Sequence, residues 1–256
     1  MSEHNNSLFD EGALPRKVMT LFMLIDTSGS MSYDGNIDKV NRAVENTIQQ
    51  LRDVSDSNFD AEIRIAILTF GDSVRWETAG AVAMDEIIWN DLSADGLTPM
   101  GAAFTELESK LSRSSFLQSS TGAYAPVIML LSDGQPTDSI DAGLAKLKKN
   151  NWYRVATKVA IAVNDEANDV LVKFTGNTET VIRYDSNKQN LQSLLTNLAV
   201  VSSKMQSRSR GANELGTAAE NGISDDVAIA NETAVEAVRQ AKEETAADGP
   251  AITTGW

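Results

Sequence analysis

Apolar runs alternate with segments of helical periodicity over most of the chain, and this alternation restricts the possible folds more than any other feature. The first run covers residues 18–25, and a run this rich in apolar side chains is typical of a strand buried on both faces. From Ile37 to Leu51 apolar residues then recur every three or four positions, as on one face of a helix. Repetition of this pattern predicts an α/β fold of three layers, in which a mainly parallel central sheet has helices on both faces.

The remaining elements follow from the same two periodicities. Only Gly71 and Asp72 separate the second and third runs, which predicts an antiparallel hairpin and therefore one antiparallel strand at an edge of the sheet. The expected strands cover residues 18–25, 61–71, 73–80, 125–134, 153–163 and 180–185. The expected helices cover residues 37–51, 99–113, 139–149, 167–174 and 188–206.

Composition sets the expected limits of the domain. We expect a flexible segment over residues 1–16, one globular domain over residues 17–206, and an acidic tail over residues 207–256. The tail has few residues to bury, so it is expected to be disordered or to become ordered on a partner. A thin apolar stripe within it would suit a helix, and consists of Val227, Ala234, Val238 and Ala241.

Charge and residue usage exclude several classes of function. The formal net charge of −14 opposes binding to nucleic acid and to anionic membranes. There is no cysteine and only one histidine, His4, so thiolate or imidazole metal sites and Ser-His-Asp catalysis are not expected. No apolar run approaches the ~20 residues of a membrane span, and the acidic N-terminus does not resemble a signal peptide. These features predict a cytoplasmic protein.

Oxygen-bearing side chains collect where two of the expected strands end. Asp26 ends the first run and Asp133 ends the fourth, and ligands of open α/β sheets bind beyond the carboxyl ends of the strands. If the two strands are neighbours, both carboxylates face one crevice, with Ser28 and Ser30 above it and Thr98 closing a third side. Oxygen ligands favour hard cations, so these five residues predict a site for Mg²⁺, with Mn²⁺ or Ca²⁺ as alternatives.

The neutral hydroxyls in this set have a chemical consequence. A cation held largely by Ser and Thr keeps much of its positive charge and attracts an anionic ligand from outside. Such a site would bind an Asp or Glu side chain of a partner protein. Each residue also has a purely structural interpretation, because Asp and Ser side chains bond local amides and Thr98 precedes a helix. Asp138 is interpreted as the cap of the helix that follows it.

Three motifs together carry a resemblance to a known family. "DTSGS" at 26–30, "GLTPMG" at 96–101 and "LSDGQPTD" at 131–138 resemble the von Willebrand factor A domain and its metal-ion-dependent adhesion site. The resemblance covers residues 18–206 and implies that Asp26, Ser28, Ser30, Thr98 and Asp133 are the metal ligands. "TPMG" and "SDGQPTD" are similar to the bacterial TerY-like group, which implies a role in tellurium resistance or stress response with protein kinase or phosphatase partners.

One enzymatic alternative remains open from the sequence. Aspartyl-phosphate phosphatases also place an Asp at the end of a first parallel strand, which would make Asp26 the nucleophile of a metal-dependent phosphohydrolase. Their second carboxylate, two residues on, is replaced here by Ser28. No phosphate-binding G-x-x-x-x-G-K-[ST] loop occurs either, so the sequence favours a binding module that is not an enzyme.

Overall fold

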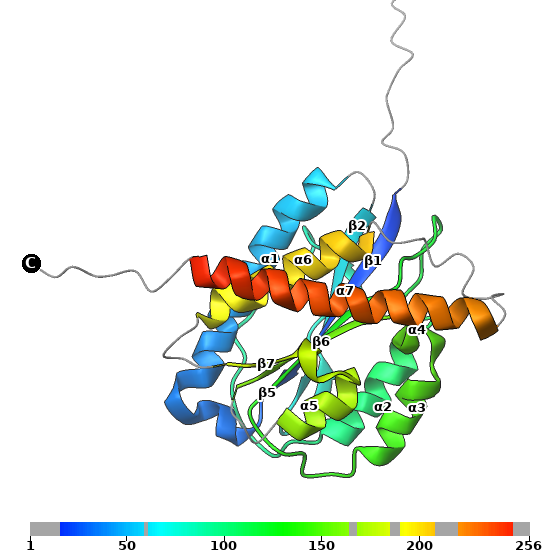
Figure 1. The fold of residues 1–256 in the computed structure, drawn as a ribbon. Helices are drawn as coiled ribbons and strands as arrows, with labels where there is room; N and C mark the ends of the chain where they lie inside the picture. The colour runs from blue at the N-terminus through cyan, green and yellow to red at the C-terminus, as the bar shows by residue number, and fades with distance from the viewer. Residues whose placement is uncertain (1–15, 59–60, 164–167, 185–189, 208–219, 248–256) are drawn as a thin grey trace, which may run out of the picture.

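A computed structural model describes residues 16–58, 61–163, 168–184, 190–207 and 220–247. Its strands form one sheet in the order β3-β2-β1-β5-β6-β7, with β4 also paired to β2 (Figure 1). β1, β2, β5, β6 and β7 run parallel, and the short β3 and β4 run antiparallel to β2. The strands are β1 Lys17–Asp26, β2 Ala61–Phe70, β3 Val74–Trp76, β4 Val82–Ala83, β5 Val127–Ser132, β6 Thr157–Ala162 and β7 Val181–Arg183.

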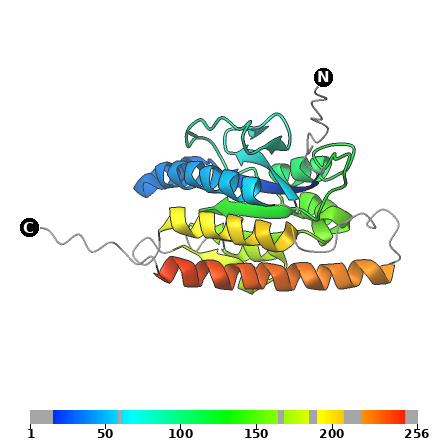
Figure 2. The ribbon, with the colours of Figure 1, turned by 90° about the horizontal axis from the view of Figure 1, so that it is seen from above.

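Helices cover both faces of this sheet, so the predicted three-layer α/β fold is confirmed. Figure 2 shows α1, α6 and α7 side by side across one face, and α2, α3 and α5 lie on the other. Among the described residues, no helix is both long and apolar enough to cross a bilayer. The helices are η1 Gly29–Gly35, α1 Asn36–Ser57, α2 Met100–Lys110, α3 Asp141–Lys149, α4 Asn151–Arg154, α5 Asn168–Thr175, η3 Thr178–Thr180, α6 Leu191–Ser207 and α7 Glu220–Ala247.

The central strand β1 contributes side chains to the hydrophobic cores on both faces of the sheet, which explains its nearly unbroken apolar sequence. Its odd-numbered residues, such as Met19 and Met23, belong to the core under α1 and α6. Phe22 and Leu24 belong to the separate core under α2 and α3. Successive side chains of a strand point to opposite faces, so a strand covered on both sides needs an apolar residue at nearly every position.

One predicted strand begins later than its apolar pattern indicated. The expected strand over residues 153–163 is shortened to β6, and Tyr153 lies in the short helix α4 instead. The side chain of Asn150 accepts hydrogen bonds from the backbone N–H groups of Trp152 (2.9 Å) and Tyr153 (3.4 Å). This cap satisfies the first amides of a helical turn and so holds Tyr153 out of the strand.

The structure also differs from the expectation of an acidic tail over residues 207–256. Residues 220–247 form α7, which packs against α6 and β6 of the same chain. Three members of the thin stripe, Ala234, Val238 and Ala241, are at most 3% exposed. Small side chains let two helices approach closely, so a stripe that looks too weak to make a core can still bury a helix. Of the expected flexible segment over residues 1–16, residues 1–15 lie outside the described residues, and Arg16 is held by hydrogen bonds.

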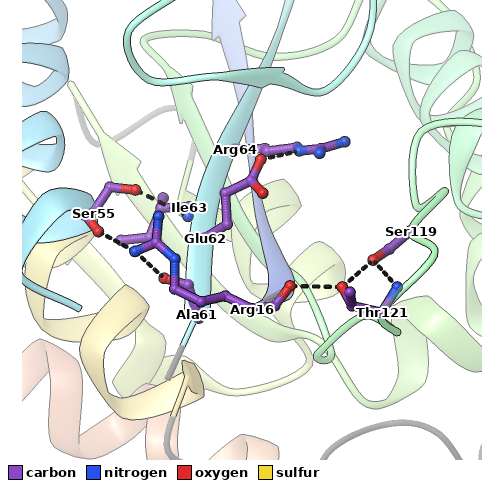
Figure 3. A network of polar contacts seen from close by, with 8 residues as sticks. All are labelled: Arg16, Ser55, Ala61, Glu62, Ile63, Arg64, Ser119 and Thr121. Carbon is purple, nitrogen blue, oxygen red and sulfur yellow. Dashed lines mark hydrogen bonds and ion pairs between the residues drawn. The ribbon is translucent and has the colours of Figure 1, made fainter. Parts of the chain in front are cut away.

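Arg16 fastens the start of β1 to the end of α1 (Figure 3). Its Nη1 donates hydrogen bonds of 2.7 Å to each of the carbonyl oxygens of Ser55 and Asn58. Thr121 Oγ1 in turn donates to the Arg16 carbonyl oxygen at 2.6 Å. The guanidinium therefore donates to carbonyl oxygens at the C-terminal end of α1, and its positive charge complements the helix dipole there.

Replacing Arg16 by Met keeps the apolar stem but removes this charged donor. We expect Arg16→Met to lower the free energy of unfolding by about 1–2 kcal/mol in urea denaturation. Arg64→Met is the matched control, because Arg64 pairs with Glu62 in a partly exposed salt bridge of 2.6 Å, and it should change stability by less than about 0.5 kcal/mol. Equal effects of the two substitutions would show that Arg16 does not fasten the helix.

Candidate metal site

The sheet order brings the two predicted strand ends together. β1 and β5 are adjacent and parallel, with Ile25 paired to Leu131. Asp26 is the last residue of β1, and Asp133 directly follows Ser132, the last residue of β5. Both carboxylates therefore lie at the carboxyl edge of the same pair of strands, the arrangement on which the sequence prediction depended.

Four of the five predicted residues form a continuous group of short contacts. Asp26 Oδ1 accepts a hydrogen bond of 2.9 Å from the backbone N–H of Ser28. The hydroxyl oxygens of Ser28 and Ser30 lie 3.1 Å apart. Ser30 Oγ donates a hydrogen bond of 2.8 Å to Asp133 Oδ1. The loop after β1 and the loop after β5 are thus joined directly through oxygen atoms.

Thr98, the fifth residue, is placed beside this group by backbone contacts. It is 6% exposed, and its N–H donates to Thr137 Oγ1 at 3.1 Å while its carbonyl accepts from Thr137 N–H at 3.0 Å. Two residues earlier, the Gly96 carbonyl accepts a hydrogen bond of 3.1 Å from the Gly29 N–H. The Thr98 loop therefore contacts both of the loops that carry the other four residues.

Glycine permits this close meeting of loops. Gly96 has a φ of +77°, and a Cβ there would lie 2.4 Å from Asp72 Cα. A Cβ on Gly71 would lie 2.6 Å from Thr27 Oγ1. Real atoms do not approach so closely, so the loops can pack together only where these side chains are absent.

Asp138 has a different role from the one predicted. Its carboxylate accepts hydrogen bonds of 2.8 Å from the N–H groups of Gly101 and Ala102, at the start of α2. The prediction that it caps the following helix was wrong, because the loop after β5 crosses the N-terminus of α2, an element far away in sequence. This cap ties the Asp133 loop to the helix that begins next to Thr98.

Ser132 is a site residue that the sequence prediction missed. It is fully buried, and its Oγ donates a hydrogen bond of 2.5 Å to Asp26 Oδ2. Together with the Ser28 N–H, it engages both carboxylate oxygens of Asp26 and fixes their orientation. The signal in the sequence was the hydroxyl residue immediately before Asp133 at the end of an apolar run.

The carboxylates of this group are withdrawn from solvent. Asp26 is 0% exposed and Asp133 is 3% exposed. Burial raises the pKa of Asp26 to about 6, and the negative charge of Asp133 acts in the same direction, whereas the hydrogen bonds from Ser132 and Ser28 lower it. The ionised form of Asp26 is therefore costly until a positive charge is placed beside it.

The spacing of the donor oxygens suits a small hard cation. Adjacent ligands of an octahedral Mg²⁺, each about 2.1 Å from the ion, lie about 3.0 Å apart. The Ser28–Ser30 and Ser30–Asp133 oxygen separations of 3.1 and 2.8 Å are close to this value. Within the described residues there is no cluster of three or more His, Cys, Asp or Glu that could hold a metal, so a cation here would depend on hydroxyls.

A three-layer α/β fold with oxygen donors at the carboxyl ends of its central strands defines a class of ligand-binding domains. Residues 20–197 match the family model of the von Willebrand factor type A domain, and the chain belongs to this family. No curated protein matches the chain in a sequence comparison.

Solved structures support the same fold at low sequence identity. The von Willebrand factor domain of the type V pili tip protein Mfa5 from Porphyromonas gingivalis is 11% identical with a TM-score of 0.53, and the alignment covers 77% of this chain and 99% of that one. The pilus adhesin SpaC from Lactobacillus rhamnosus GG is 13% identical with a TM-score of 0.54, over 73% of this chain and 31% of that one. Proximal thread matrix protein 1 from the mussel byssus is 15% identical with a TM-score of 0.50, over 72% and 47%. This chain thus spans less than half of the last two proteins.

Proposed function

We propose that the protein is a metal-dependent interaction module that binds an Asp or Glu side chain of a partner protein. The proposed ligands are Asp26, Ser28, Ser30, Thr98 and Asp133, with Mg²⁺ as the preferred ion and Mn²⁺ or Ca²⁺ as alternatives. The observation that carries the proposal is the continuous series of polar contacts from Asp26 through the N–H and hydroxyl of Ser28 and the hydroxyl of Ser30 to Asp133. Proteins of this family generally mediate protein–protein interactions, which supports a binding role.

The mixture of neutral and charged ligands in the proposed site favours binding of a carboxylate from a partner protein. Ser28 and Ser30 offer neutral hydroxyl oxygens, while Asp26 and Asp133 supply negative charge from buried positions. A bound divalent ion supplies the positive charge that attracts an external anion. Because the hydroxyls neutralise none of that charge, the partner's carboxylate is a strongly favoured additional ligand.

The geometry argues against the phosphohydrolase alternative. A nucleophilic carboxylate must reach a phosphorus atom with a free oxygen. Asp26 is fully buried, and Ser28 stands where such enzymes place the second carboxylate that acts as acid and base. We therefore propose a role without catalysis.

The biological setting is proposed from the motifs alone. The similarity of "TPMG" and "SDGQPTD" to the TerY-like group supports a cytoplasmic protein in bacterial tellurium resistance, stress response or defence. A protein kinase or phosphatase is the partner class that this similarity favours. Copurification from native cells with and without a chelator would identify the partner.

Removing one carboxylate charge from the site should weaken metal binding strongly. We expect Asp133→Asn to weaken the affinity for Mg²⁺ or Mn²⁺ by at least about 100-fold in titration calorimetry, because one anionic donor is lost from a low-dielectric site. Asp34→Asn is the matched control. Asp34 is exposed in the same loop region with a φ of +53°, a conformation that Asn also tolerates. Equal affinities of wild type and Asp133→Asn would contradict the proposed site.

A further inference from the structure

Two large apolar side chains stand exposed on the loops that carry the proposed ligands. Tyr33 is 72% exposed and follows Ser30 in η1, and Leu97 is 67% exposed and directly precedes Thr98. In the described part of the chain, the other exposed large hydrophobic residues are Ile88, at 84%, and Ile229, at 48%. Exposed apolar side chains that gather at a proposed site indicate a contact surface.

Tyr33 is exposed to solvent, whereas Met31, two positions earlier, is buried in the core. Met31 is fully buried in the core, whereas Tyr33 lies before a turn in which Asp34 and Gly35 both have left-handed φ values of +53° and +62°. A left-handed conformation is unfavourable for Asp by roughly 1 kcal/mol. Tyr33 therefore lies exposed at the entry to this turn, immediately before α1 begins at Asn36.

Acidic side chains surround the same edge of the sheet. Asp34, Asp72 and Asp95 are all exposed. The backbone of Asp72 lies against Gly96, and Gly96 bonds to Gly29 of the loop that carries Ser28 and Ser30. The loops that carry or contact the proposed ligands therefore bear two exposed apolar side chains, Tyr33 and Leu97, and three exposed carboxylates.

We infer that this surface recognises an extended peptide segment with one acidic residue, apolar residues two positions on either side, and basic residues beyond them. This inference rests on the proposed function. In an extended chain, side chains two positions apart point the same way, so a residue that reaches the metal presents its second neighbours to the same surface, on which Tyr33 and Leu97 are exposed. The carboxylates of Asp34, Asp72 and Asp95 repel further acids and attract Lys or Arg. Tyr33 and Leu97 together are called the apolar rim.

Charge also decides between a peptide of this kind and a second copy of the chain. Two molecules that each carry a formal net charge of −14 repel one another, whereas a basic peptide is attracted to the carboxylates of Asp34, Asp72 and Asp95. A dimer that forms only with Mg²⁺ and is lost in Leu97→Ser, as measured by sedimentation, would assign the apolar rim to self-association and overturn the inference.

The test uses the full chain with Mg²⁺ and a fluorescent peptide, Lys-Ser-Leu-Ser-Asp-Ser-Leu-Ser-Lys, measured by anisotropy, in which Asp, Leu and Lys all lie on one face of an extended chain. We expect this peptide to bind about tenfold more tightly than the same peptide with Ser in place of both Leu. The difference should disappear in the variant Tyr33→Ser/Leu97→Ser and persist in Ile229→Ser, whose site lies on α7 and is 48% exposed. Replacing both Lys by Gln should weaken binding mainly at low ionic strength.

The outcomes separate the inference from the proposed function. If the Asp→Asn peptide binds as well as the Asp peptide, or if a chelator has no effect, carboxylate capture by a metal is wrong. If binding requires both Asp and Mg²⁺ but Leu and Ser peptides bind equally, only the role of the apolar rim is wrong. If no peptide binds while the chain still binds Mg²⁺, the inferred peptide class is wrong and the metal site stands.

Discussion

Replacing Gly101 by Ala should lower the free energy of unfolding by about 3 kcal/mol, although alanine is the better helix former by about 1 kcal/mol. A Cβ at this position would lie 2.2 Å from the carbonyl oxygen of Ser139. A Cβ on Gly143, in α3, would in turn lie 2.6 Å from the Gly101 carbonyl oxygen. The starts of α2 and α3 meet at these atoms, and neither backbone can move without disturbing the Asp138 cap.

Urea denaturation measures this effect, with Gly80→Ala as its control. A Cβ on Gly80 has nothing within 4 Å, so that substitution should be close to neutral. Gly101→Ala should also weaken Mg²⁺ binding, because the cap links the loop of Asp133 to the helix that follows Thr98. Equal stabilities of the two alanine variants would show that the helix contact can relax without cost.

The second large effect is a pH dependence that arises from Asp26. Its pKa is about 6 in the folded protein against an ordinary value of 3.8, so between these values the folded chain holds a proton that the unfolded chain has released. Stability in the presence of a chelator should therefore fall as the pH rises through this window, by about 3 kcal/mol in total, and remain low at neutral pH. Denaturation curves at a series of pH values give this profile.

Asp26→Asn isolates this contribution from other titrating groups. The amide keeps the shape of the side chain and carries no charge, so the variant should not lose stability over this pH range and should be more stable than wild type at neutral pH with chelator present. Mg²⁺ should then stabilise wild type at neutral pH, more weakly near the pKa of about 6, and leave the variant unchanged. Parallel pH profiles of the two proteins would contradict the raised pKa.

Most strands could be predicted from the sequence, because helices cover both faces of the sheet and its strands are therefore nearly continuous apolar runs. An element that must be apolar at nearly every position, such as β1 or β5, stands out without knowledge of its neighbours. Asp26 and Asp133 were predictable for a related reason, since each interrupts such a run at its carboxyl end. The prediction required β1 and β5 to be adjacent, and only the structure established that.

What the sequence did not reveal depends on contacts between distant segments. The long connection before Thr98 is held to α1 by the side chain of Asn41, which bonds both the N–H and the carbonyl of Leu92, at 2.8 and 2.9 Å. Asp138 caps α2 rather than α3 for the same kind of reason. Neither partner is recognisable from local spacing, because the residues involved are tens of positions apart.

The packing of α7 determines where the C-terminal boundary of a stable fragment of this protein should lie. Likeness to the family stops at residue 197, yet α7 continues the folded body to residue 247 and buries Ala237 and Ala241 completely. A fragment cut at the limit of family likeness would lose α7 and part of α6, and would leave an apolar flank of β6 open to water. The segment that resembles the family, residues 20–197, is thus shorter than the folded unit, which extends to Ala247.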